Sequence, residues 1–191
     1  MTFDIILAGV GGQGVLSVSA VIASAAMERG LFVKQSEVHG MAQRGGAVLA
    51  NLRLSDAPIA SDLIPQGRAA LILSMEPLES LRYLAFLSPS GHVITSINPV
   101  QNIPTYPPIE EVLAQIHRLP HVSLVDAEKL ARHAGSIRAV NMVMVGAASR
   151  VLPFEPELLE RLIAARFGSK GPKVVEQNLA AFRAGREAAA A

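Results

Sequence analysis

Residues 5–14 read Ile-Ile-Leu-Ala-Gly-Val-Gly-Gly-Gln-Gly, and this stretch decides the fold. The apolar run 5–8 predicts a first strand, and residues 13–29 predict a helix because apolar side chains recur on one face. A glycine-rich turn between strand and helix lets the backbone approach a ligand, and it offers the N–H groups of the helix start to a phosphate or carboxylate. The candidate ligand-binding glycines are Gly9, Gly11, Gly12 and Gly14.

The same glycines also have a purely structural explanation, which is close packing of the helix on the strand. A dinucleotide site further needs an acidic residue about 20 positions beyond the glycines, at the end of the second strand. Glu37, which lies 23 residues after Gly14, is the only candidate, and a polar loop follows it instead of an ordinary strand–helix turn. The full NAD or FAD fingerprint is therefore not met. A free-standing nucleotide-binding module, either a sensor or an NAD-dependent enzyme, stays open as an alternative.

Strands and helices continue to alternate beyond this first unit. Strands are predicted at 31–38, 47–54, 70–75, 92–97 and 122–125, and a helix that begins with a proline at 77–87. The segment 98–108 contains four prolines and no periodicity, so it is predicted to be a surface connection. From residue 137 the pattern is helical. The prediction is one domain, 1–191, with a three-layer α/β/α Rossmann-like fold, a mostly parallel sheet and a helical C-terminal third.

The composition favours a protein that buries part of its surface against a partner. Charged residues make up 17% of the chain, half of the residues are apolar, and the mean hydropathy is +0.36. Globular domains usually contain about 25% charged residues. A well-filled core is the other explanation of this composition, and we expect the isolated chain to self-associate if the partner explanation is correct. The net charge of +1 gives no case for nucleic-acid binding.

Several kinds of chemistry are excluded or unsupported by the residues present. With no cysteine, the chain cannot bind an iron–sulfur cluster through thiolates or use a thiol nucleophile. The five histidines lack the spacing of a metal site, and no nucleophile–base motif appears, so we expect neither a metal nor a catalytic residue in this chain. The N-terminus has no basic segment, and no apolar run approaches the roughly 20 residues that span a bilayer. We expect a cytoplasmic protein without a membrane partner.

Residues 36–46 read Ser-Glu-Val-His-Gly-Met-Ala-Gln-Arg-Gly-Gly, a run without hydrophobic periodicity after the predicted second strand. Together with the glycine turn, this run resembles the gamma-type subunits of the 2-oxoacid:ferredoxin oxidoreductases. Within that family it is most similar to the beta subunits of the branch that acts on indolepyruvate. The resemblance extends through 76–83, 141–146 and 170–185, which include the recurrent family positions Asn141, Lys170, Asn178 and Gly185. Relatives that oxidise pyruvate or 2-oxoglutarate have a tyrosine-containing variant before the Arg-Gly-Gly, whereas this chain has His39 to Gln43.

The resemblance implies the small subunit of an oxidoreductase that converts an arylpyruvate, CoA and oxidised ferredoxin into an aryl-acetyl-CoA, carbon dioxide and reduced ferredoxin. In that family a large partner subunit carries thiamine diphosphate and the 4Fe-4S clusters. The present chain would bind no cofactor of its own and would be inactive alone. It would complete the heteromeric complex and shape the CoA or substrate channel. A scaffold that binds only its partner is a related alternative.

The loop after the second strand contributes the other candidate site residues, which are Glu37, His39, Gln43, Arg44, Gly45 and Gly46. The guanidinium of Arg44 can present a fork of donors to a carboxylate or phosphate, or it can form a structural ion pair with Glu37. His39 can bond a substrate, but a lone histidine is more often structural. Lys170, between Gly168 and Gly171, can reach an anion such as a CoA phosphate, although an exposed lysine is the ordinary explanation.

Overall fold

The computed structural model describes residues 1–39, 45–101 and 103–189, except for the side chain of His39. Its strands are β1 (Thr2–Val10), β2 (Phe32–His39), β3 (Ala47–Ser55), β4 (Ala69–Ser74), β5 (Leu87–Ser96) and β6 (Val122–Val125). Its α-helices are α1 (Val15–Glu28), α2 (Pro77–Arg82), α3 (Ile109–Ile116), α4 (Ala127–His133), α5 (Val140–Ala148), α6 (Pro156–Phe167) and α7 (Pro172–Ala188). The 3-10 turns are η1 (Leu84–Phe86), η2 (Ile137–Ala139) and η3 (Gly168–Lys170).

The six strands form one sheet in the order β2-β3-β1-β4-β5-β6. The pairs β1–β4, β4–β5 and β5–β6 are parallel, as the alternation of strands and helices predicts. β3 is antiparallel to both of its neighbours, so the sheet is mixed. Only the connection 40–46 separates β2 from β3, and it is too short for the crossover of a dozen or more residues that a parallel pair requires.

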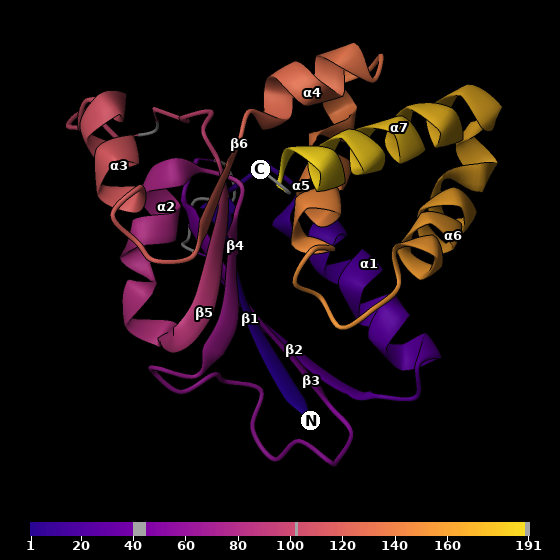
Figure 1. Cartoon of the computed structure of the whole chain (residues 1–191), viewed down its shortest axis with the longest axis horizontal. Helices are drawn as coiled ribbons and strands as arrows, with labels where there is room; N and C mark the ends of the chain where they lie inside the picture. The colour runs from indigo at the N-terminus through magenta and orange to yellow at the C-terminus, as the bar shows by residue number, and fades with distance from the viewer. Residues whose placement is uncertain (40–44, 102, 190–191) are drawn as a thin grey trace.

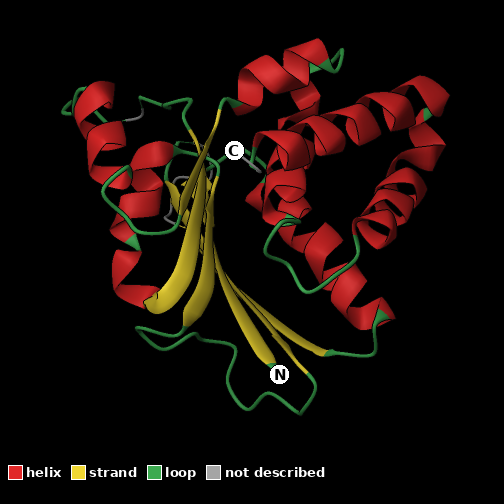
Figure 2. Cartoon of the chain, viewed as in Figure 1, coloured by secondary structure: helices red, strands yellow, loops and turns green. Residues whose placement is uncertain are grey.

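Helices cover both faces of the sheet, as the three-layer prediction requires. In Figure 1, α2 and α3 lie on one side, and α1 with α4, α5, α6 and α7 lies on the other; Figure 2 shows the same layers by secondary structure. The larger core cluster joins the sheet to α1 and the C-terminal helices, whereas a smaller cluster around Ile6, Ile72 and Val93 underlies α2. The C-terminal third of the chain, which is predicted to be helical from residue 137, contains α5, α6 and α7.

Two short helices were not predicted, and the predicted helix 77–87 divides into α2 and η1. α3 has eight residues, of which only Val112 and Ile116 are buried. α4 has seven residues and is capped by Asp126, whose carboxylate accepts a hydrogen bond from the N–H of Lys129 at 3.2 Å. Two buried residues in α3 and one capping residue before α4 are too few to produce a recognisable helical periodicity in the sequence.

The backbones of α5 and α7 cross in direct contact. A Cβ added to Gly146 of α5 would lie 1.9 Å from the carbonyl oxygen of Phe182, and a Cβ added to Gly185 of α7 would lie 1.9 Å from that of Val143. Every residue from Met142 to Ala148 is buried, as the uncharged sequence predicts. Glycine at both positions therefore fixes how α7 packs over α5, and α5 in turn packs on α1.

The strand order reverses between β1 and β4. β1 leads through α1 to β2 on one side of the sheet, and β4 leads through α2 to β5 on the other side and on the opposite face. The carboxyl ends of two neighbouring parallel strands whose connections diverge in this way border a crevice, which is where open α/β sheets bind their ligands. The glycine turn after β1 lies at this edge.

Candidate functional site

The glycine turn contains three glycines that are required for different reasons. Gly12 and Gly14 have φ values of +102° and +78°, which other residues rarely adopt, and no atom would meet a Cβ at Gly12. A Cβ at Gly9 would instead lie 2.9 Å from Val15 Cγ2 and 3.2 Å from Met75 Cβ. The turn therefore fits both a structural and a ligand-binding role. Gly9 allows close packing of the helix on the strand, and Gly12 leaves open space that a ligand could occupy.

Gln13 crosses the crevice between the ends of β1 and β4. Its Oε1 accepts a hydrogen bond from the N–H of Val10 at 2.7 Å, and its Nε2 donates to the carbonyl of Met75 at 3.1 Å. The N–H of Met75 donates to Ala8 at 2.9 Å. One side chain thus gives hydrogen-bond partners to the N–H of Val10 and to the carbonyl of Met75, at the ends of two neighbouring strands. Gln13 was not among the predicted site residues, because its partner Met75 lies far along the chain.

The glycine turn is joined to the end of the 36–46 loop and to α5. The N–H of Gly11 donates to the carbonyl of Gly46 at 2.8 Å, and the N–H of Gly45 donates to the carbonyl of Gly11 at 3.3 Å. Asn141 donates from Nδ2 to the carbonyl of Gly14 at 3.4 Å. The structure therefore brings together two separately predicted groups, the turn glycines and the Gly-Gly pair, at one edge of the sheet.

Part of the turn remains available to a ligand. The N–H of Gly11 and that of Gln13 are used within the protein, since Gln13 N–H donates to Val10 at 3.0 Å. In the part of the chain that the structure describes, the N–H groups of Gly12, Gly14 and Val15 have no backbone acceptor. Adjacent N–H groups at a helix start attract anions, so the arrangement can bind a phosphate or carboxylate.

The remaining loop candidates are only partly within the described residues. Glu37 lies in β2 and pairs with Ala50, while the backbone of His39 pairs with Val48. The side chain of His39, together with Gln43 and Arg44, lies outside the described residues, so the predictions about these groups stay predictions. Glu37 does have an interaction partner.

Lys170 lies in a different part of the molecule from the glycine turn. Its Nζ lies over the ring of Phe167, 5.5 Å from the centroid, at the corner between α6 and α7. Asn141 joins α5 to the turn and Gly185 packs α7 on α5, whereas Lys170 precedes α7. With about 1.5 Å of rise per residue, Pro172 is roughly 20 Å along the helix from Gly185. Lys170 therefore does not belong to the crevice between β1 and β4.

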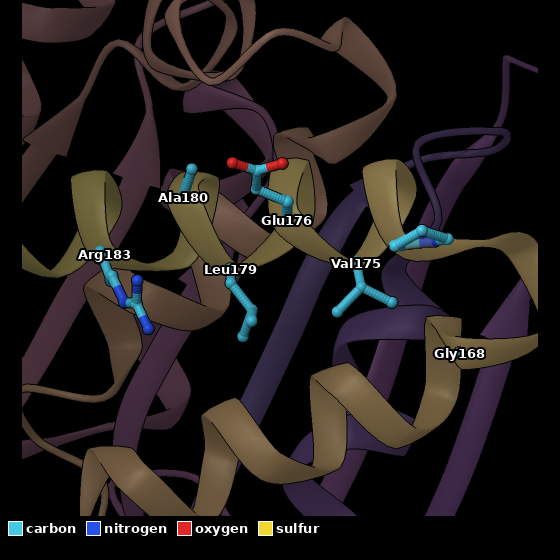
Figure 3. A pocket seen from close by; sticks show the side chains of 7 residues that line it. Gly168, Val175, Glu176, Leu179, Ala180 and Arg183 are labelled. Carbon is cyan, nitrogen blue, oxygen red and sulfur yellow. The ribbon is translucent and has the colours of Figure 1, made fainter.

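A groove of about 710 Å³ lies next to the Lys170 corner and is lined by Gly168 of η3 and by residues of α7. Figure 3 shows Val175 and Leu179 of α7 pointing toward α6, with Glu176 and Arg183 along the same helix. Arg183 forms an ion pair with Glu160 of α6 at 2.6 Å. The groove is mainly apolar and carries no group of reacting side chains.

Metal and membrane sites find no support in the described residues. No three His, Asp or Glu side chains among them gather into a group that could hold a metal ion. Nor does any of the described helices have the length and apolarity to cross a membrane. An iron–sulfur cluster does not fit this chain either, because its sequence contains no cysteine.

Comparison with known proteins assigns the family. Residues 4–188 match the family model described as pyruvate ferredoxin/flavodoxin oxidoreductase. The chain belongs to this family. It is 40% identical to the indolepyruvate oxidoreductase subunit IorB of Methanothermobacter thermautotrophicus, over 100% of this chain and 99% of that one. It is 28% identical to the 2-oxoglutarate synthase subunit KorC of Archaeoglobus fulgidus, over 96% of this chain and 86% of that one.

Solved structures of oxidoreductases in the family have the same fold. The pyruvate oxidoreductase subunit PORC of Thermotoga maritima matches with a TM-score of 0.73 and 25% identity over 98% of this chain and 96% of that one. A 2-oxoglutarate:ferredoxin oxidoreductase from Magnetococcus marinus, solved with 2-oxoglutarate, coenzyme A and succinyl-CoA bound, matches with a TM-score of 0.76 and 22% identity. The matched region includes 99% of the present chain but only 31% of the longer Magnetococcus chain. The predicted gamma-type subunit is confirmed.

Proposed function

We propose that this chain is the small subunit of an enzyme that oxidatively decarboxylates indolepyruvate or a related arylpyruvate to the acyl-CoA and passes the electrons to ferredoxin. The observation that carries the proposal is the 40% identity to an indolepyruvate oxidoreductase subunit over essentially the whole of both chains. The 28% identity to a 2-oxoglutarate synthase subunit is lower by a clear margin. The arylpyruvate branch is therefore favoured over the 2-oxoglutarate branch.

The cofactors of the reaction belong, in this proposal, to a larger partner subunit. Thiamine diphosphate would stabilise the carbanion left by decarboxylation, and 4Fe-4S clusters would carry the electrons. The complete lack of cysteine in this chain supports placing the clusters on the partner. The relatives are themselves subunits by name, which supports a heteromeric assembly.

The contribution of this chain would be to hold CoA in the crevice between β1 and β4. Gly12 leaves open space at the turn, whereas Gly14 packs against Asn141, and the N–H groups of Gly12, Gly14 and Val15 are available to bind a CoA phosphate. Glu37, His39, Gln43 and Arg44 would line the crevice or the contact with the partner, next to Gly45 and Gly46. Lys170 would then have a separate role, because it lies at the α6–α7 corner.

Reconstitution from separately purified subunits tests the proposal. We expect that neither subunit alone reduces ferredoxin, and that the mixture does so only when both indolepyruvate and CoA are present. The Gly12→Val variant, which places a β-branched residue at a φ of +102°, should raise the KM for CoA. Full activity of the large subunit without this chain would contradict the proposal.

The free-standing NAD module is not favoured, since the family match extends over residues 4–188. Titration of the isolated chain with NAD provides the direct check. We expect no saturable binding, and a stoichiometric complex with NAD would support the alternative instead.

A further inference from the structure

The proline-rich loop formed by residues 98–101 and 103–108 lies at the same carboxyl edge of the sheet as the glycine turn, because it directly follows β5. Its first residue is fixed to α4. Asn98 donates from Nδ2 to the carboxylate of Asp126 at 3.1 Å, and its Oδ1 accepts from the N–H of Glu128 at 3.0 Å. The loop thus begins at a defined position beside the end of β6.

The carboxylate of Glu76 holds this loop from the other side. Glu76 is only 1% exposed, and its Oε1 accepts hydrogen bonds from the N–H of Val100 at 3.3 Å and from the hydroxyl of Tyr106. The other oxygen, Oε2, accepts from the N–H of Glu79 at 2.8 Å and so caps α2. Because prolines have no N–H, the loop has few backbone donors, so the N–H of Val100 and the side-chain hydroxyl of Tyr106 are its anchors on Glu76.

Tyr106 acts in this contact as a neutral hydrogen-bond donor. Burial and the hydrogen bond to Glu76 raise the pKa of the Tyr106 hydroxyl well above its usual value. The phenol therefore stays protonated at physiological pH and can always donate to the carboxylate. Removing the hydroxyl removes one anchor of the loop and leaves the cap of α2 in place.

The anchored loop and the glycine turn follow β5 and β1 at the same edge of the sheet, and β4 lies between these two strands. Glu76 immediately follows Met75, whose carbonyl accepts the hydrogen bond from Gln13. A short path of bonds therefore leads from the glycine turn through Gln13, Met75 and Glu76 to Tyr106. A rigid wall beside a phosphate-binding turn limits where the rest of a long ligand can lie.

We propose that Glu76 and Tyr106 are positioning residues that fix the described loop residues, 98–101 and 103–108, as one wall of the crevice that receives CoA. The inference rests on the proposed function, because it takes CoA as the ligand of that crevice. It goes further in assigning a role to a buried carboxylate and a tyrosine that contact no reacting group. Loss of the Tyr106 hydroxyl should loosen the wall and weaken CoA binding without slowing the chemical step.

The test compares Tyr106→Phe with Tyr83→Phe in the assembled enzyme. Tyr83 is partly buried at the end of α2, and its hydroxyl makes no hydrogen bond within the described residues, so it is a matched control. We expect Tyr106→Phe to raise the KM for CoA roughly 5- to 10-fold, the change that loss of one ordinary hydrogen bond predicts, with kcat unchanged. Amide hydrogen exchange at residues 98–108 should become faster. Tyr83→Phe should change neither quantity.

The outcomes separate this inference from the proposed function. Unchanged hydrogen exchange in Tyr106→Phe would show that the hydroxyl does not fix the loop, and would overturn the inference. Faster exchange with an unchanged KM for CoA would overturn it as well, because the loop would not be a wall of the CoA site. A fall in kcat with no change in KM would also contradict a positioning role. Failure of the proposed function would appear differently, as wild-type activity that does not depend on CoA.

Discussion

The side chain of Gln13 ties the two strand ends of the crevice together. Gln13→Ala would leave the N–H of Val10 and the carbonyl of Met75 without their partner. We expect this substitution to lower the free energy of unfolding by about 1–3 kcal/mol, the usual cost of leaving such groups unsatisfied. Gln66→Ala, at an exposed position, is the control and should have no measurable effect. Equal urea denaturation midpoints for the two variants would show that the bridge contributes nothing.

Glu79 is a buried carboxylate with incomplete hydrogen bonding. It is 2% exposed, its Oε1 lies 3.0 Å from Arg82 Nε, and its Oε2 has no hydrogen-bond partner among the described residues. Burial raises the pKa of Glu79 above 4.5, against the opposing effect of Arg82. Ionisation of Glu79 therefore costs stability as the pH rises through the folded-state pKa, and this cost is absent below about 4.5.

The Glu79→Gln variant should accordingly be more stable than the wild type at pH 7, by up to about 1.4 kcal/mol for each unit by which the pKa is raised. The advantage should disappear as the pH is lowered below about 4.5, because the wild-type carboxyl is then protonated in both the folded and unfolded states. Thermal melts followed by circular dichroism at several pH values measure the difference. Glu110→Gln at an exposed site is the control. A Glu79→Gln difference that does not vary with pH would contradict this account.

The sequence predicts the candidate site residues unevenly. The turn glycines are recognisable because a G-x-G-x-x-G pattern lies between an apolar run and a helical one. Gln13 lies inside that pattern, yet its role depends on Met75, and the role of Glu76 depends on Tyr106. Contacts between residues so far apart in the chain leave no local pattern. Lys170 is the converse case, since its flanking glycines suggest an anion site, whereas the fold places it away from the crevice.

Among the elements, the crossing of α5 and α7 is the contact that least tolerates change. Gly146→Ala would place a Cβ 1.9 Å from the carbonyl of Phe182, and backbone cannot move aside as a flexible side chain can. We expect severe destabilisation, on the order of 3 kcal/mol or more, or loss of soluble expression. Gly168→Ala is the matched control, because it has no atom within 4 Å of the added Cβ and a φ of −54°. It should be neutral or slightly stabilising. Similar melting temperatures for both variants would refute the close crossing.

Elements with long apolar patterns are the ones that the sequence predicts well. β6 has the predicted bounds 122–125, and the strand predicted at 47–54 is β3 with one residue added. The direction of β3 is not readable from its composition, because a buried strand has the same apolar pattern in either direction. It follows instead from the length of the connection 40–46. Short helices such as α3 and α4 bury too few residues to produce a period.

At the scale of the whole molecule, exposed apolar side chains are consistent with a chain that works in an assembly. Leu16, Met27, Phe32 and Val38 are between 46% and 67% exposed. We expect the purified chain to self-associate in a concentration-dependent way, and the partner subunit to suppress this association. Light scattering coupled to size-exclusion chromatography measures both effects. A strictly monomeric chain at high concentration would argue against an obligate partner.

Substrate preference tests most directly whether this chain belongs to an arylpyruvate-oxidising enzyme. The measurement is kcat/KM of the reconstituted two-subunit enzyme for indolepyruvate, pyruvate and 2-oxoglutarate, each with saturating CoA and ferredoxin. We predict a preference for indolepyruvate of at least roughly 100-fold. The smaller acids bury less apolar surface in a pocket shaped for an aromatic side chain, and they therefore lose about 3 kcal/mol of binding free energy. Equal or higher kcat/KM for pyruvate or 2-oxoglutarate would contradict the account.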